Sequence, residues 1–441
     1  MTNKFKSIAG ALMIATITVV AISAFTTTTN TVKTKTDAVS CAKLTDKGCI
    51  FKTLLGMEDY DKATIIKNKT LVEAALSHGL EWMAAAQSSS GGWGSGSHNF
   101  QQIMDPHAVE ADPATTALVG MALLRNQQTN AKGKYAVNFN KAVNYLLAVV
   151  EQTPSNAANI SQLTDRQPQV KLGRNIDVIL TAQFMTNYLQ QSSLDAQQKD
   201  RVNKALQKCV TMIQRTQDTD GSWKDGGWAP VLQSALANNA LESAKEAGAK
   251  VDDKVMEKSR SYQKNNYDTK TNSALTGKAA GVLLYSVSGS ARASAKEAKL
   301  AEVTMDYARK NGTLKTTDKV SKENLVKAGM AAPEAEKYVA AYEVNRAASK
   351  RAQDNDIING FGSNGGEEYL SYLMTGESLV VSGDNDWKKW YDQTSGRLLQ
   401  IQNNDGSWNG HHCITSPVFC TATCLLILSI DKDIDFLIKV K

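Results

Sequence analysis

A seven-residue motif recurs three times in this chain and constrains its fold more than any other feature. The copies are QSSSGGW from Gln87 to Trp93, QDTDGSW from Gln217 to Trp223, and QNNDGSW from Gln402 to Trp408. Each copy follows one helical pattern and precedes a loop and a second, apolar helical pattern. Asp and Gly after a helix favour a sharp stop and a turn, and a Trp can fold back over the helix end. Each copy therefore predicts the corner of a helical hairpin.

The copies lie too far apart to be consecutive hairpins, so degenerate hairpins are expected between them. Helical patterns predict a second hairpin from 135–152 with 174–191, and a fourth from 252–266 with 275–289. A fifth opens at 295–312, and two segments compete for its second helix, 333–353 and 365–378. In all, the patterns predict about six hairpins, which can close into a ring with an outer and an inner helical layer around a central cavity.

Two of the motif copies resemble the Q-W repeats of the terpenoid cyclase and protein prenyltransferase superfamily. These are QDTDGSW and QNNDGSW, while QSSSGGW is a looser match. The resemblance implies an all-α fold, an (α/α)6 toroid, over residues 65–433. It says little about the reaction, because the motifs lie at structural corners.

The catalytic signatures of that superfamily are not intact in this sequence. No Asp-x-Asp-Asp acid occurs, and Asp218 and Asp220 lie inside a corner motif. Asp252 and Asp253 lack the third carboxylate of a DDxxD run and suit a helix N-terminus instead. The chain has seven Trp and nine Phe, few for a chamber that stabilises carbocations, since three Trp are used at corners. Terpene cyclisation is therefore disfavoured.

The N-terminus carries a targeting signal. Lys4 and Lys6 precede an apolar run at 8–25, which predicts a signal peptide cleaved after Ala24 or an uncleaved membrane anchor over residues 1–25. Residues 26–64 are expected to be a flexible tether and the domain entry. We therefore expect a secreted or periplasmic protein. The net charge of +6 includes no dense basic run, so no nucleic-acid partner is expected.

Export makes disulfides available to the six cysteines. Cys41 and Cys49 are the easiest pair, and Cys413 could reach Cys420 or Cys424. Cys209 is expected to be a buried thiol. The segment HHC at 411–413 has three open interpretations: a zinc site using His412 and Cys413, a disulfide-braced helix end with Cys420 and Cys424 in the core, or a polar ligand-binding surface.

The loops that precede the second helix of each hairpin are long and polar, and four of the five histidines lie in them. In a closed ring these loops open on one rim, at helix N-termini that carry spare N–H donors. The candidate catalytic residues there are His98, Arg174, Tyr267, Glu367 and His412. The candidate ligand-binding residues are His107, Asp112, Trp228, Asn364, Glu368 and His411.

Three functions remain open from the sequence. The first is an exported toroid protein that binds a small molecule or glycan in its central cavity or at its rim, without turnover. The second is an exported glycan lyase or hydrolase that uses rim residues for proton transfer. The third is a divergent prenyltransferase-like or cyclase-like enzyme.

Overall fold

The computed structural model describes residues 69–129, 132–382 and 386–433 of the chain. The predicted signal or anchor segment, the tether, and Cys41 and Cys49 lie outside these residues. In the described part, no helix is both long and apolar enough to cross a membrane.

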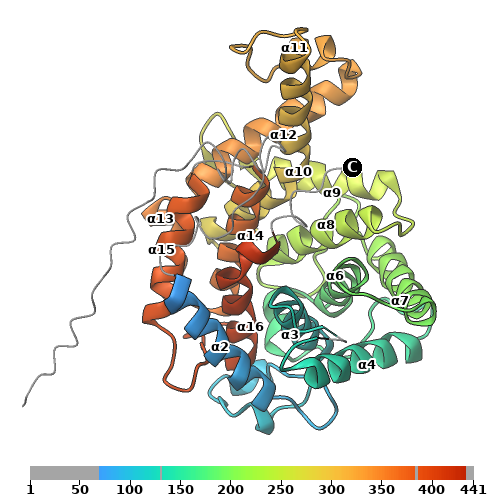
Figure 1. The fold of residues 1–441 in the computed structure, drawn as a ribbon, viewed down its shortest axis with the longest axis vertical. Helices are drawn as coiled ribbons and strands as arrows, with labels where there is room; N and C mark the ends of the chain where they lie inside the picture. Colours follow the sequence, from blue (N-terminus) through green and yellow to red (C-terminus); the bar gives the residue numbers. More distant parts are fainter. Residues whose placement is uncertain (1–68, 130–131, 383–385, 434–441) are drawn as a thin grey trace, which may run out of the picture. The chain divides into compact units, whose positions relative to one another are not determined.

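The described residues are mostly helical and contain almost no strand, which confirms the all-α prediction (Figure 1). They contain one short antiparallel strand pair, β1 (Tyr267–Asp268) with β2 (Ser273–Ala274). Connecting segments include the short helices η2 (His98–Phe100), η3 (Pro106–Ala108), α5 (Gln167–Lys171), α11 (Lys322–Lys327) and α13 (Asn355–Ile358). The last short helix, η4 (Ile430–Asp433), follows the final α-helix.

Six helices, here called the core helices, form a continuous set of contacts. They are α3 (Pro113–Arg125), α6 (Ile176–Gln191), α8 (Pro230–Glu246), α10 (Leu283–Lys310), α14 (Gly366–Ser382) and α16 (Pro417–Leu428). Each core helix contacts the next along the chain, and α16, the last, contacts α3, the first. All residues of α3 and α16 are buried, which explains their apolar character around the whole helix.

A covering helix alternates with each core helix in the sequence. The covering helices are α2 (Lys69–Ala85), α4 (Ala136–Gln152), α7 (Ala196–Arg215), α9 (Asp253–Asn265), α12 (Ala332–Arg351) and α15 (Asp386–Gln400). In α7, for example, Val202, Leu206, Cys209 and Ile213 are buried at helical spacing while the other face is polar. The covering helices thus place one apolar stripe on the core helices and face solvent with the other side.

The predicted boundary between the fourth and fifth hairpins is wrong. Residues 275–289 and 295–312 were expected to belong to different hairpins, but α10 runs through both from Leu283 to Lys310. The intervening Gly and Ser residues suit close packing rather than a turn. A Cβ added at Gly289 would lie 3.2 Å from the Cβ of Ala235 in α8. The fifth hairpin therefore consists of α12 and α14, so both competing segments form helices.

The three motif copies form structurally equivalent corners. In each copy the Trp indole N–H donates to a backbone carbonyl ten residues earlier at 2.8 Å, and the acceptors are Met83, Ile213 and Leu398. The motif glycines have left-handed φ angles of +91°, +89° and +94°, and they are Gly91, Gly221 and Gly406. Glycine adopts this conformation without a Cβ penalty. Each copy therefore forms the same hydrogen-bonded corner.

The motif glutamines connect neighbouring hairpins. Each side-chain amide donates to the carbonyl of its motif glycine and to one backbone carbonyl near or in a covering helix. Those second acceptors are Asn138 in α4, Val255 in α9 and Ala75 in α2, at 2.9, 2.9 and 3.0 Å. The bond from Gln402 to Ala75 joins the last copy of the motif to the first described helix.

Candidate functional site

The structure brings three of the predicted site residues together at the N-terminus of α14. Glu367 and Glu368 occupy the first turn of this helix, and His412 lies in the loop before α16. Tyr285, in the first turn of α10, completes the group. We call Tyr285, Glu367, Glu368 and His412 the rim cluster.

Glu368 is the centre of the rim cluster. It is fully buried, and its Oε1 accepts the hydroxyl proton of Tyr285 at 2.6 Å. Its Oε2 accepts the backbone N–H of Gly365 at 2.9 Å and lies 3.4 Å from His412 Nε2. Burial and the neighbouring charge of Glu368 raise the pKa of Tyr285 far above its ordinary value, so Tyr285 stays a hydrogen-bond donor.

Glu367 holds a proton at neutral pH. Its side chain is buried and accepts the backbone N–H of Ile414 at 3.2 Å. Burial and the charge of Glu368 raise the pKa of Glu367 to about 8. Two adjacent buried carboxyl groups thus differ in their environments, since Glu368 accepts hydrogen bonds from Tyr285 and Gly365 and Glu367 accepts one from Ile414.

The two ring nitrogens of His412 differ, since Nε2 contacts two oxygen atoms and Nδ1 has no hydrogen-bond partner among the described residues. Its Nε2 lies 3.0 Å from the carbonyl oxygen of Ser363 and 3.4 Å from the Oε2 of Glu368. Both of these atoms are acceptors, so Nε2 carries a hydrogen. Among the described residues, buried Nδ1 has no hydrogen-bond partner.

Two glycines allow the loop before α16 to approach α14. A Cβ at Gly365 would lie 2.7 Å from the carbonyl oxygen of His412, and one at Gly366 would lie 2.7 Å from the Cβ of Ile414. Both distances are too short for a side chain, so only glycine fits at these two positions. The approach is held by a bond from Gly366 N–H to Ile414 O at 3.0 Å. The sequence GSNGGEE therefore positions both carboxyl groups against His412.

Cys413 follows His412 with a left-handed φ of +57°, which is strained for a residue with a Cβ. Burial and the charge of Glu367 raise the pKa of the Cys413 thiol to about 12. The thiol therefore stays protonated at neutral pH and is a poor nucleophile in this environment.

Exposed aromatic rings flank the rim cluster. Phe361 is 52% exposed, and its ring centroid lies 5.2 Å from His412 and 6.5 Å from Tyr285. Trp228 is 59% exposed, and the Nζ of buried Lys171 lies 3.3 Å from its ring centroid. The positive charge of Lys171 also acts to lower the pKa of Glu367, against the effect of burial. Lys171 therefore links Trp228 to the rim cluster.

His98 packs against Trp228, with the ring centroids 6.2 Å apart. Burial and the positive charge of Lys171 lower the pKa of His98, so this imidazole is neutral at neutral pH. Its Nδ1 lies 2.5 Å from the side-chain nitrogen of Gln101. His98 therefore belongs to the Trp228 side of the rim.

Other predicted site residues have structural partners instead. Asp112 caps α3 by accepting the backbone N–H of Thr115, and burial raises its pKa. Tyr267 is buried in β1, and Arg174 is exposed, with Nη1 3.8 Å from Asp225 Oδ1. The remaining three predicted site residues are Asn364, His107 and His411. The carbonyl of Asn364 accepts the backbone N–H of His411, and the side chains of His107 and His411 are exposed.

The structure adds Tyr285, Lys171 and Phe361, which the sequence analysis did not select. Tyr285 stands in the first turn of a core helix, so a search for polar side chains at those helix starts could have found it. Lys171 and Phe361 lie in connecting segments with no pattern of their own. Their positions depend on contacts between distant parts of the chain.

The cysteines of the described region are all free thiols, so the expected pairing of Cys413 with Cys420 or Cys424 is wrong. Cys420 and Cys424 are fully buried in α16, as the core interpretation predicted. Within the described residues, no three His, Cys, Asp or Glu side chains are grouped so that they could hold a metal ion.

No family model matches this chain, and no curated protein or solved structure matches it either.

Proposed function

We propose that the chain is an exported α/α toroid protein related in architecture to the terpenoid cyclase and protein prenyltransferase superfamily. The toroid is supported by the alternation of core and covering helices, the contact of α16 with α3, and the bond from Gln402 to Ala75. Export is supported by Lys4 and Lys6 before the apolar run at 8–25. Sequencing the N-terminus of the exported protein tests this: a start after Ala24 supports a cleaved signal, and a protein retained inside the cell contradicts export.

The function that the geometry supports best is glycan binding at the rim cluster. The observation that carries this proposal is the pair of exposed rings, Phe361 and Trp228, beside buried polar groups. Aromatic faces stack on the apolar faces of sugar rings, and a few fixed polar groups orient the hydroxyls. Lys171, His98 and His412 would supply those polar contacts.

Calorimetric titration with neutral and acidic oligosaccharides tests this proposal. Trp228→Ala should weaken binding about tenfold, which corresponds to roughly 1.4 kcal/mol. Tyr307→Ala is the matched control, since Tyr307 is a 69% exposed aromatic residue near the other end of α10. Equal affinity in both variants, or no binding to any oligosaccharide, would contradict glycan binding at this rim.

A second candidate, glycan hydrolysis, is favoured by the proton on Glu367 and by His412 Nδ1, which has no hydrogen-bond partner among the described residues. In this reaction Glu367 donates its proton to the leaving oxygen, and His412 Nδ1 accepts a proton from the attacking water. Glu367→Gln separates the two candidates. Retained binding with lost release of reducing ends supports hydrolysis, whereas a wild type that binds oligosaccharides without releasing reducing ends supports binding alone.

A further inference from the structure

Lys171, at the end of α5, is a buried cation without an ion-pair partner. The residue is only 2% exposed, and within the described residues its Nζ makes no hydrogen bond and no ion pair. The contact that Nζ does make is with the Trp228 ring, whose centroid is 3.3 Å away. Burying an ammonium group without a hydrogen-bond acceptor is costly, so this position favours the binding of an anion.

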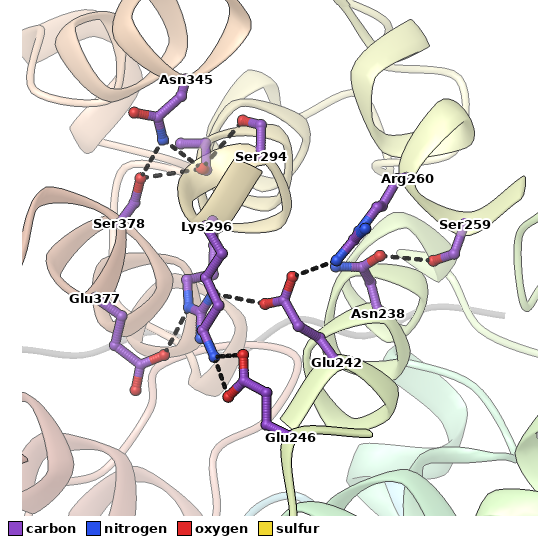
Figure 2. A network of polar contacts seen from close by, with 12 residues as sticks. Asn238, Glu242, Glu246, Ser259, Arg260, Ser294, Lys296, Asn345, Glu377 and Ser378 are labelled. Atoms are coloured by element: carbon purple, nitrogen blue, oxygen red, sulfur yellow. Dashed lines mark hydrogen bonds and ion pairs between the residues drawn. The ribbon is translucent and has the colours of Figure 1, made fainter. Parts of the chain in front are cut away.

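Buried cations on the core helices, in contrast, have carboxylate partners and form a charge network. Lys296 is 6% exposed, and its Nζ lies 2.5 and 2.6 Å from the two carboxylate oxygens of Glu246 (Figure 2). Glu377 serves two guanidinium groups, with Oε1 2.9 Å from Arg125 Nη2 and Oε2 3.1 Å from Arg292 Nε. These cations are compensated within the chain, whereas the lysine beside Trp228 is not.

The Nζ of Lys171 can be reached from solvent. Among the described residues, Lys299 Nζ is an example of a nitrogen that is both fully enclosed and without a hydrogen-bond partner. Lys171 Nζ also has no hydrogen-bond partner, but it is not fully enclosed, so it keeps some accessible surface. It lies against the ring of Trp228, which is largely exposed. A ligand that contacts this ring therefore comes within reach of the ammonium group.

The backbone holds Trp228 beside Lys171. The N–H of Ala229 donates to the carbonyl of Lys171 at 2.9 Å. A Cβ added at Gly227 would lie 2.3 Å from the carbonyl oxygen of Leu172, so this close approach requires glycine. The ring and the ammonium group are thus placed together by main-chain contacts between two connecting segments, and not by the flexible side chains alone.

Three side chains whose pKa is affected by Lys171 carry no charge at neutral pH. Burial and the charge of Lys171 lower the pKa of His98, so its imidazole is neutral. Burial raises the pKa of Glu367 to about 8 and that of the Cys413 thiol to about 12, so both groups hold their protons. None of the three therefore offers a negative charge to Lys171.

We propose that the rim binds an acidic glycan, and that Lys171 Nζ holds the anionic group of a sugar bound against Trp228. This inference rests on the proposed glycan binding and names the class of glycan. One ammonium group matches one negative charge, which either a uronic acid carboxylate or a sulfate ester carries, and hydrogen bonds between charged groups are stronger than neutral ones. The exposed ring contributes affinity for sugars in general, and Lys171 selects the acidic ones.

Calorimetric titration of the full chain with acidic oligosaccharides and their neutral counterparts tests the inference directly. Galacturonate, glucuronate and mannuronate trimers are each compared with their methyl esters, which keep the sugar but lack the charge. A sulfated galactan trimer is compared with its desulfated form. At least one acidic form should bind roughly tenfold more tightly than its neutral counterpart, and the preferred series identifies the anionic group. Equal affinity for acidic and neutral forms throughout would overturn the inference.

Lys171→Met locates the charge, because methionine retains an unbranched side chain against Trp228 without the ammonium group. Affinity for the acidic glycan should fall roughly tenfold, to that of the neutral form, while affinity for the neutral form should stay the same. Lys204→Met is the matched control, since it removes one positive charge from an exposed position of α7. Unchanged affinity in Lys171→Met, or an equal loss in Lys204→Met, would overturn the role of Lys171.

The outcomes separate this inference from the proposed function. Binding that is weakened in Trp228→Ala but does not distinguish acidic from neutral forms would support glycan binding at the rim and overturn the role of Lys171. No binding of any oligosaccharide would overturn both. If Lys171→Met does not fold, the comparison of acidic and neutral forms on the wild type still decides whether the glycan is acidic.

Discussion

Helix α14 carries glutamates in two contrasting environments. Glu377, in its second half, lies between two arginines, which lower its pKa. Glu367, in the first turn, is buried, and burial and the neighbouring Glu368 raise its pKa to about 8. The two residues are ten positions apart, which corresponds to roughly 15 Å of helix. The same residue type on the same helix is therefore a paired charge at one position and a proton carrier at the other.

The contrast indicates which acids hold the fold together and which are available for chemistry. A buried, paired carboxylate is fixed by its partners, and removing one partner leaves an uncompensated charge. A buried carboxyl group with a raised pKa exchanges its proton near neutral pH, which is the property that acid–base sites require. We therefore assign Glu377 to structure and Glu367 to the candidate site.

The largest effect is expected at the paired position. Glu377→Gln removes the charge shared by Arg125 and Arg292, so unfolding free energy should fall by about 3–5 kcal/mol. Glu343→Gln, an exposed change on α12, is the control and should have little effect. Urea unfolding of both variants measures the difference. Equal unfolding free energies for Glu377→Gln and Glu343→Gln would contradict the assignment of Glu377 to the stability of the fold.

A smaller effect, with a defined pH dependence, is expected at Glu367. Between its ordinary pKa of 4.5 and the folded value of about 8, the folded state binds more protons at this group than the unfolded state. Stability should therefore fall as pH rises through this window, by up to about 1.4 kcal/mol per pH unit. Glu367→Gln cannot titrate, so its stability should fall less steeply. Burial and the charge of Asp112 raise the pKa of Asp177 to about 7. Asp177 therefore adds the same pH dependence of unfolding free energy to the wild type and to Glu367→Gln.

Urea unfolding at several pH values within the window measures these slopes. The amide of Gln can still accept the Ile414 N–H, so packing should be little changed. Parallel slopes in wild type and Glu367→Gln would mean that Glu367 does not carry the proton assigned to it.

The smallest effect on stability is expected at the exposed aromatic residue of the rim. Trp228→Ala should change unfolding free energy by no more than about 0.5 kcal/mol, because the ring is largely in solvent. Trp223→Ala removes a fully buried corner ring and should cost about 3–5 kcal/mol. Thermal unfolding compares the two. A large loss for Trp228→Ala would make this ring part of the fold rather than of a binding surface.

The sequence predicted the corners well because their bonds are local. The Trp of each copy bonds the carbonyl ten residues earlier, the Gln bonds the carbonyl of its own motif glycine, and that glycine sets the turn; the second bond of each Gln, to a distant helix, is not local. The boundary within α10 was misjudged because Gly289 suits both a turn and a close helix contact, and only the position of Ala235 decides between them.

The rim was predicted in part and the charge network not at all. Glu367, Glu368 and His412 were selected because they lie in polar segments beside helix starts. Tyr285 and Lys171 join them only through contacts between distant helices, which no local pattern reveals. The same holds for Arg125, Arg292 and Glu377, which lie on three different helices and read in sequence as ordinary charged residues.

Carbon-13 NMR titration of the glutamate side-chain carboxyl groups measures whether Glu367 holds a proton at neutral pH. Comparison of wild type with Glu367→Gln identifies the Glu367 resonance as the one that disappears. We expect a titration midpoint near 8 for that resonance. A midpoint near the ordinary value of 4.5 would show an ionised Glu367 and would contradict its assignment as the acid of the rim cluster.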